Sequence, residues 1–130
     1  MPLPHRCSLS TLHGPYGMQW VGTRPAPSNP AQIETFTGVA IRTFDGAGTF
    51  TQVSNVKGVI SGLEPQNIES VGTYDVNGDC SGTATSQFVP GAPPVTARFV
   101  IVDDGAELLQ SVMTPASIFN AGVIKKVHKK

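Results

Sequence analysis

Apolar and polar residues alternate with a period of two along much of this chain, and that period is typical of β-strands. In the segment 16–23, for example, one face carries Tyr16, Met18 and Trp20. No clear amphipathic helix interrupts the pattern, although a short helix over Pro115–Asn120 is an alternative at the start of the last strand. The alternation predicts strands at Tyr16–Thr23, Gln32–Phe44, Thr49–Val56, Ile68–Val76, Cys80–Val89, Val95–Val102, Glu107–Thr114 and Ser117–Val127.

Turn-forming residues separate these segments. Asn77-Gly78 lies between two β-rich runs and favours the positive φ angles of a tight hairpin turn. The sequence Asp45–Gly48 predicts another turn. Prolines crowd the segment Arg24–Pro30, which predicts a loop without a regular ladder. Gly38 lies within a predicted strand and predicts a bend or a bulge.

Strands of similar length joined by turns predict an antiparallel up-and-down sheet. About eight strands is the size at which such a sheet closes on itself, and closure removes the exposed edges that promote aggregation. We therefore predict an all-β fold, an eight-stranded antiparallel up-and-down β-barrel, with a two-sheet β-sandwich as the alternative. The predicted organisation is an N-terminal arm over residues 1–12, a single barrel domain over 13–124 and a basic tail over 125–130.

Composition and charge narrow the class of protein. The 130 residues fit one domain, and nine Lys and Arg balance nine Asp and Glu. This neutrality argues against nucleic acid as a partner, because phosphate binding depends on clustered positive charge. No apolar run approaches the length that spans a bilayer. The segment 1–10 lacks the apolar region of a signal peptide, which predicts a cytoplasmic protein, or an exported one whose leader has been removed.

Cys7 and Cys80 are the only cysteines, too few for a disulfide framework or a zinc site. A single bridge in an exported protein and two independent thiols are the alternatives. The aspartates fall at predicted turns, and their spacing matches no calcium loop. We predict no metal and no cofactor.

Four segments carry a resemblance to known proteins: Leu12–Gly17, Thr43–Gly48, Gly72–Thr83 and Phe99–Asp103. Together they resemble a group of small bacterial β-proteins with the same order of turns. More broadly the chain is similar to calycin-type barrels, which include lipocalins and allene oxide cyclase-like proteins. The resemblance implies a barrel that holds a small hydrophobic molecule, which some members only carry and others guide through a cyclisation.

Arg42 is the main candidate for chemistry inside the predicted barrel. It shares a strand face with Phe36 and Phe44. If that face points inward, the guanidinium needs a carboxylate or a ligand oxygen, because an unpaired buried charge is very costly. The alternative is that this face meets solvent. Sequence parity leaves the choice open, because one bulge exchanges the two faces of every residue that follows.

Other candidates are aromatic or titratable. Tyr16, Trp20 and Tyr74 combine apolar area with one hydrogen-bonding group each, which suits a pocket mouth or simple core packing. Arg98 and Glu107 form a pair, or Glu107 acts as a general acid, if both face inward; otherwise they lie on the surface. His13 precedes the first predicted strand as a loop histidine. The candidate catalytic residues are therefore Arg42, Tyr74, Arg98 and Glu107, and the candidate ligand-binding residues are Tyr16, Trp20, Phe36, Phe50, Phe99 and Met113.

These features predict a barrel that binds a small hydrophobic or oxygenated molecule. The binding site would guide a cofactor-free isomerisation, cyclisation or elimination by acid–base chemistry. The alternatives are a carrier without chemistry and a structural, envelope-associated β-protein filled by its own side chains. Val, Ile and Thr on both strand faces would also permit a homodimer through the outside of the barrel.

Overall fold

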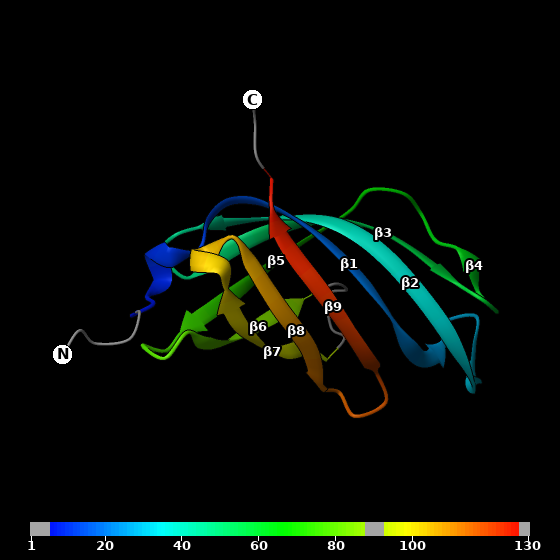
Figure 1. The fold of residues 1–130 in the computed structure, drawn as a ribbon. Coiled ribbons are helices and arrows are strands. Elements are labelled where there is room, and N and C mark those ends of the chain that lie inside the picture. Colours follow the sequence, from blue (N-terminus) through cyan, green and yellow to red (C-terminus); the bar gives the residue numbers. More distant parts are fainter. Residues whose placement is uncertain (1–5, 88–92, 128–130) are drawn as a thin grey trace.

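The computed structural model describes residues 6–87 and 93–127 and contains one antiparallel sheet with two short 3-10 helices (Figure 1). No helix in these two ranges is long and apolar enough to cross a bilayer. The helices are η1 (Leu9–Thr11) and η2 (Asp103–Gly105), and the strands are β1 (His13–Ala26), β2 (Asn29–Asp45), β3 (Thr49–Gly58), β4 (Gly62–Leu63), β5 (Ile68–Val76), β6 (Ser81–Gln87), β7 (Val95–Val102), β8 (Glu107–Thr114) and β9 (Phe119–Lys126).

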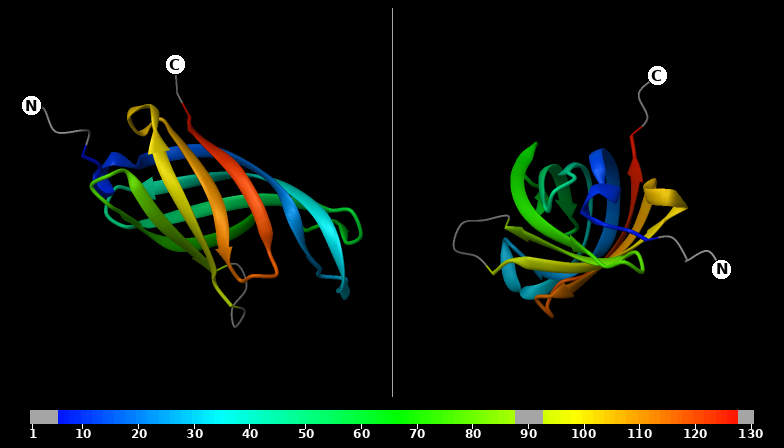
Figure 2. Two further views of the ribbon diagram at one scale, coloured as in Figure 1. Left: turned by 60° about the horizontal axis from the view of Figure 1, so that its bottom comes forward. Right: turned by 90° about the vertical axis from the view of Figure 1, so that its left-hand side faces the viewer.

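Eight of the strands close into a barrel. Each pairs antiparallel with its neighbour in the order β2-β1-β9-β8-β7-β6-β5-β3, and pairing of β2 with β3 completes the ring. The closing ladder runs from Phe36 opposite Gly58 to Phe44 opposite Phe50. The short strand β4 lies outside the ring and pairs only with β3. The predicted eight-stranded up-and-down barrel is confirmed, and the end-on view in Figure 2 shows the strands surrounding a common axis.

Large inward-facing rings pair with glycines on neighbouring strands. Trp20 lies opposite Gly38, and a Cβ atom on Gly38 would overlap the indole ring. Phe50 covers Gly72 in the same way. The ladders through Gly38 are regular, so the predicted bulge there is wrong: the glycine makes room for a ring. Register shifts occur instead at Pro25/Ala26 and at Thr96/Ala97.

One end of the barrel is capped by the segment that precedes β1. Cys7 forms a disulfide with Cys80, with Cα atoms 4.9 Å apart, so the bridged alternative is the one found. Leu12 is completely buried. The Tyr74 hydroxyl donates to the carbonyls of Leu9 and Leu12. Within the predicted N-terminal arm, residues 6–12 are therefore part of the folded barrel, while 1–5 lie outside the described residues.

Three local predictions need correction. The Asn77-Gly78 connection is a four-residue loop between β5 and β6, in which Cys80 rather than Gly78 has the positive φ. Arg24–Pro30 is mostly ladder, because β1 and β2 continue as a two-stranded hairpin beyond their other neighbours. Each strand there has a free edge, where proline can be accommodated. Lys125 and Lys126, assigned to a tail, belong to β9.

Candidate functional site

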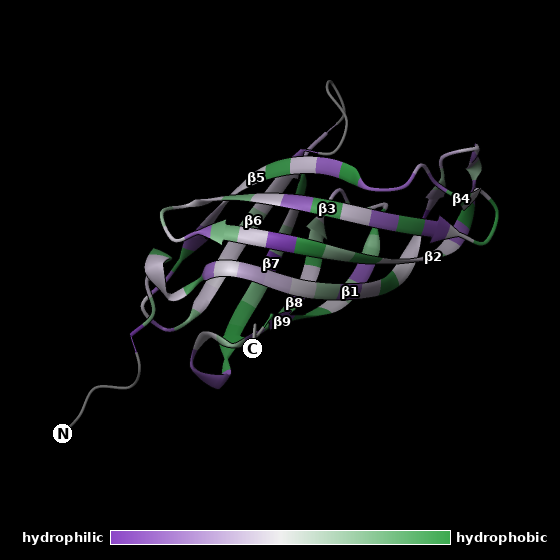
Figure 3. Ribbon diagram, turned by 90° about the horizontal axis from the view of Figure 1, so that it is seen from above, coloured by the Kyte–Doolittle hydropathy of each residue, from purple (hydrophilic) through white to green (hydrophobic). Residues whose placement is uncertain are grey.

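A group of polar side chains lies inside the barrel, in a core that is otherwise aromatic and aliphatic. Figure 3 shows that polar and apolar stretches succeed one another along β2 and β3. Six polar side chains on the inward face are buried and come from β2, β3, β5, β6 and β8: Arg42, Gln52, Ser54, Ser70, Ser86 and Gln110.

Arg42 is at the centre of this group and is only 3% exposed. Its Nε donates to Gln52 Oε1 at 2.8 Å, across the β2–β3 ladder. Its Nη1 donates to Gln110 Oε1 at 3.0 Å. Gln110 belongs to β8, three strands from β2 around the ring, so the arginine side chain reaches across the lumen. Of the two alternatives for Arg42, the structure shows the one in which its strand face points inward.

The charge of Arg42 has no acidic partner within residues 6–87 and 93–127. Among the described residues, no carboxylate forms an ion pair with it, and both acceptors are neutral amide oxygens. The guanidinium carbon lies 4.3 Å from the centre of the Phe50 ring, a cation–π distance. Burial lowers the pKa of Arg42 to about 9, because a low-dielectric interior disfavours the charged form. The side chain is therefore still cationic at neutral pH.

Ser70 adds an unsatisfied hydroxyl to the same row of the sheet. Arg42 on β2, Gln52 on β3 and Ser70 on β5 are consecutive cross-strand partners. Gln52 Nε2 donates to Ser54 Oγ at 2.9 Å, which fixes the orientation of the amide. The hydroxyl of Ser70 is buried and has no hydrogen-bond partner, alone among buried side-chain polar atoms in the described ranges. Such an atom calls for a physical reason, such as a bound molecule.

Side-chain size differs on the two sides of Arg42. Toward the capped end, large rings pack edge to face: the Phe44 ring centre is 5.2 Å from that of Tyr16 and 4.9 Å from that of Tyr74. Away from the cap, Met18 and Trp20 of β1 face inward, but several other inward positions carry small side chains. The small side chains, three of which belong to the polar group, are Ala40, Ser54, Ser70, Ser86 and Ala97.

The two tyrosines support the cap and do not reach toward Arg42. The Tyr16 hydroxyl donates to the carbonyl of Gly105 in η2, and the Tyr74 hydroxyl donates to carbonyls beside η1. Burial raises the pKa of both hydroxyl groups. Each hydroxyl proton is donated to a backbone carbonyl. The Tyr74 hydroxyl is therefore not placed to donate its proton to a molecule next to Arg42, as its predicted catalytic role would require.

Arg98, Glu107 and Met113 lie on the outside of the barrel. The inward positions of β7 and β8 are taken by residues such as Phe99 and Leu108, so their sequence neighbours face outward. The alternative of an inward Arg98–Glu107 pair is wrong. Glu107 Oε1 instead lies 4.0 Å from Lys125 Nζ, and Met113 is half exposed.

The other predicted ligand-binding residues are inside. Trp20, Phe36, Phe50 and Phe99 are each less than a tenth exposed and face inward. The sequence interpretation missed Gln52, Gln110 and Ser70. The usable signal was parity, since Gln52 lies two residues after Phe50 and Ser70 four residues before Tyr74 on strands with a regular period of two.

A second buried charge, Glu34, lies toward the uncapped end and is fully paired. Its carboxylate accepts hydrogen bonds from Arg24 Nε at 2.9 Å and from the backbone N–H groups of Ile60 and Ser61 at 2.9 and 2.8 Å. Burial raises the pKa of Glu34, but these donors outweigh it, so the pKa is lowered. Glu34 thereby anchors the loop after β3 and is not available to a ligand.

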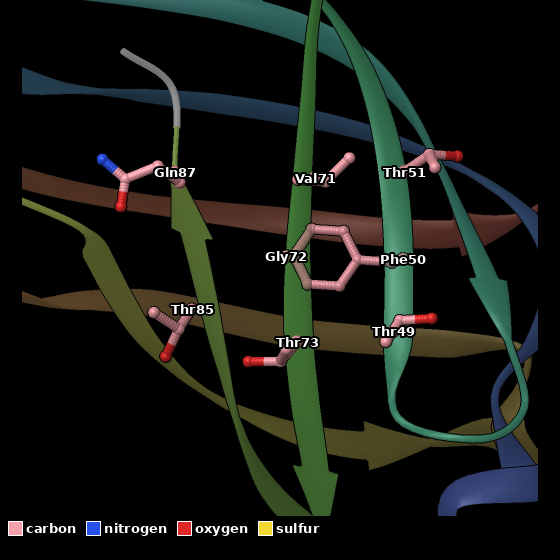
Figure 4. Close-up of a pocket in the computed structure, with 8 residues that line it drawn as sticks. All are labelled: Thr49, Phe50, Thr51, Val71, Gly72, Thr73, Thr85 and Gln87. Carbon is pink, nitrogen blue, oxygen red and sulfur yellow. The ribbon is translucent and has the colours of Figure 1, made fainter. Parts of the chain in front are cut away.

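Two hollows open on the outside of the barrel. One, of about 460 Å³, lies over Gly72 between threonines of β3, β5 and β6, where Figure 4 shows the Phe50 ring against the glycine. The other, of about 700 Å³, lies over β6 to β9 and is bordered by Arg98, Leu109 and Met113. Both are broad and open to solvent, in contrast to the buried polar group.

The described residues contain no group of three or more His, Cys, Asp or Glu side chains placed to hold a metal ion. No protein-family profile matches the chain. No curated protein matches it either.

Proposed function

We propose that the barrel binds a small molecule inside its lumen, next to Arg42 and on the side away from the cap. One observation carries the proposal: Arg42 is buried inside the barrel, and its hydrogen-bond acceptors among the described residues are two neutral amide oxygens. An apolar side chain of similar size would stabilise such a core better, since buried charges are usually retained at a cost. The arginine is explained if it anchors a ligand.

The surrounding residues support the same location. Small side chains occupy the neighbouring inward positions, and an eight-stranded barrel is just wide enough for its own side chains or for one small ligand. Trp20 and Phe36 lie further from the cap and offer apolar contact. The ligand would therefore have a polar oxygen-bearing end near Arg42 and an apolar body, as the resemblance to calycin-type barrels also predicts.

Carriage has more support than catalysis. Acid–base chemistry needs a group that can exchange a proton next to the bound molecule. Tyr74 donates to backbone carbonyls, Glu107 lies outside, and Arg42 remains protonated at neutral pH. An isomerase, cyclase or lyase activity would have to rely on shape and on Arg42 alone, so we propose a carrier.

The fluorescence of Trp20, the only tryptophan, tests this proposal. It is titrated with a panel of small apolar molecules that carry hydroxyl, carbonyl, ester or carboxylate groups. We expect saturable quenching by some members, which is lost in Arg42→Ala. The variant Arg98→Ala, which removes an arginine from the outer surface, should bind as the wild type does. A flat response from folded protein across the panel would refute the proposal and favour a structural role.

We also propose that the protein self-associates through the outside of β7, β8, β9, β1 and β2. Val100, Leu109 and Val123 are 49%, 47% and 41% exposed and lie directly opposite one another across the strands. Gln19 continues this row to Val39 on β2. An exposed row of apolar side chains, here interrupted only by Gln19, is typical of an interaction surface, and a neutral chain does not repel its own copy.

Sedimentation velocity at several protein concentrations tests the self-association. We expect a dimer that Leu109→Glu converts to monomer. The matched control is Val71→Glu, since Val71 is 62% exposed on β5 at the opposite side of the ring. A wild-type monomer at all concentrations, or equal loss of the dimer in both variants, would contradict this surface.

A further inference from the structure

We infer that the molecule bound inside the barrel is a monoanion, best a monocarboxylate, whose oxygens are held by the Arg42 guanidinium and the Ser70 hydroxyl. This inference rests on the proposed function and specifies the chemical class of its ligand. It follows from the charge and the hydrogen-bonding capacity that the described residues leave uncompensated inside the barrel.

The charge of Arg42 requires an anion more than a neutral oxygen. Gln52 and Gln110 each supply a neutral acceptor, and neither can compensate a full positive charge. The guanidinium has five N–H donors in a planar fork that matches the two oxygens of a carboxylate. A carboxylate adds direct attraction between opposite charges, which a neutral oxygen lacks and which is strong in a low-dielectric interior. A carboxylate therefore gains most from this position.

Ser70 provides an independent donor. Its hydroxyl is buried, has no partner and lies in the same cross-strand row as Arg42 and Gln52. A serine hydroxyl can donate one hydrogen bond to an anionic oxygen, and a buried hydroxyl without that bond destabilises the protein. One anion next to this row would satisfy the arginine and the serine together.

The remaining charges limit the ligand to a single negative charge. Glu34 is the other buried charged side chain among the described residues, and it is already paired with Arg24 and with two backbone N–H groups. Arg42 is the only buried lysine, arginine or histidine among the described residues, and the other inward positions around the row carry serine, glutamine, alanine and aromatic side chains. Only one positive charge is thus free for the ligand, and a dianion would bury an uncompensated charge.

Matched pairs of probes separate this inference from the proposed function. Benzoate is compared with benzamide and hexanoate with hexanamide, because each pair has the same shape and differs in charge. Adipate, a dicarboxylate, and inorganic phosphate complete the set. Binding is measured by Trp20 fluorescence and by calorimetry at pH 7. We expect each monocarboxylate to bind at least tenfold more tightly than its amide, and adipate and phosphate to bind more weakly than hexanoate.

Variants assign the preference to its residues. Arg42→Met should abolish the preference for the acid, and Arg42→Lys should retain part of it, because lysine keeps the charge without the fork. Ser70→Ala should weaken carboxylate binding several-fold and amide binding less. Arg98→Met should change neither. Circular dichroism and the urea midpoint establish that each variant is folded before binding is compared.

Each outcome supports or overturns a stated claim. Equal affinity for acids and amides would overturn the monoanion inference and leave the small-molecule site standing. A preference for acids that survives in Arg42→Met but is lost in Arg98→Met would move the site to the outer hollow and overturn both claims. Absence of binding by every probe, together with absence of an organic anion in a mass-spectrometric extract of the purified protein, would also overturn both.

Discussion

Replacing Arg42 by methionine should make the ligand-free protein more stable. Burial lowers the pKa of Arg42 from its ordinary value to about 9, which corresponds to a cost of roughly 5 kcal/mol for burying the charge. The substitution also removes the hydrogen bonds to Gln52 and Gln110, and each amide oxygen left unpaired costs about 1–3 kcal/mol. With about 2 kcal/mol for each of the two amide oxygens, the difference is a net gain of roughly 1 kcal/mol in the free energy of unfolding, within the range seen when buried charges are replaced by apolar groups.

The pH dependence gives this prediction a second readout. The folded-state pKa of Arg42 is below its unfolded value, so from about pH 9 up to the ordinary arginine pKa the unfolded chain binds more protons at this group than the folded protein does. The wild type should therefore gain stability as pH rises above 9, by about 1.4 kcal/mol per pH unit at this site. Arg42→Met lacks this gain, so its advantage over the wild type should be complete at pH 7 and shrink above pH 9.

Urea unfolding followed by Trp20 fluorescence and circular dichroism measures both quantities. Arg98→Met is the matched control, because Arg98 is exposed on β7, and its effect should stay within about 0.5 kcal/mol. Protein must first be freed of bound ligand by partial unfolding and refolding. A less stable Arg42→Met at pH 7 would mean that the two glutamines and the Phe50 ring already compensate the charge. The argument for an anionic ligand would then lose its basis.

Other features of the fold lead to three further predictions. Gly38→Ala should lower the free energy of unfolding by about 1–3 kcal/mol and shift the tryptophan emission, because the new methyl group overlaps the indole ring, whereas Gly78→Ala meets nothing within 4 Å and should do neither. Replacing Cys7 and Cys80 by serine should cost roughly 4 kcal/mol in a urea titration, since the bridge closes a loop with a sequence separation of 73 residues; an unchanged midpoint would count against it. Because the pKa of Glu34 is lowered on folding, its contribution should be present above pH 4.5 and be lost as pH falls below that value, and Glu34→Gln should flatten this part of the acid-stability curve.

The strands were predictable because their residues follow a period of two between turn-forming residues. The direction in which each face points was harder to predict, and β2 shows why. One face carries Val39 and Ile41, the other Phe36 and Arg42, so neither is plainly apolar. In the structure the face with the rings points inward. A barrel lumen must be filled by large side chains, while single aliphatic residues are tolerated on an outer surface.

The site was less predictable than the fold because its contacts depend on several strands at once. Arg42 meets Gln110 across a sequence separation of 68 residues, and only closure of the ring brings β8 opposite β2. The missing partner of Ser70 is likewise visible only once its neighbours are placed. The prolines of 24–30 led to the wrong prediction of a loop for a related reason. A proline interrupts a ladder where both edges of its strand are paired, but it is accommodated at a free edge. In this segment β1 and β2 extend beyond their other neighbours, so each has a free edge.

The capped end of the barrel is stabilised by several interactions, whereas the buried charge of Arg42 destabilises the fold. At the capped end a disulfide, the hydrogen bonds of two tyrosine hydroxyls and edge-to-face rings hold the strands together. Next to this end the chain buries the costly charge of Arg42, and several small side chains follow on the side away from the cap. Natural sequences depart from the usual rules of core packing mainly at functional sites. The stability of the capped end offsets the free-energy cost of the buried arginine. A ligand present at one hundred times its Kd adds about 2.7 kcal/mol to the wild type, more than the roughly 1 kcal/mol expected from removing the arginine. The ligand-saturated wild type should therefore be the more stable protein, and its arginine becomes understandable only with the ligand in place.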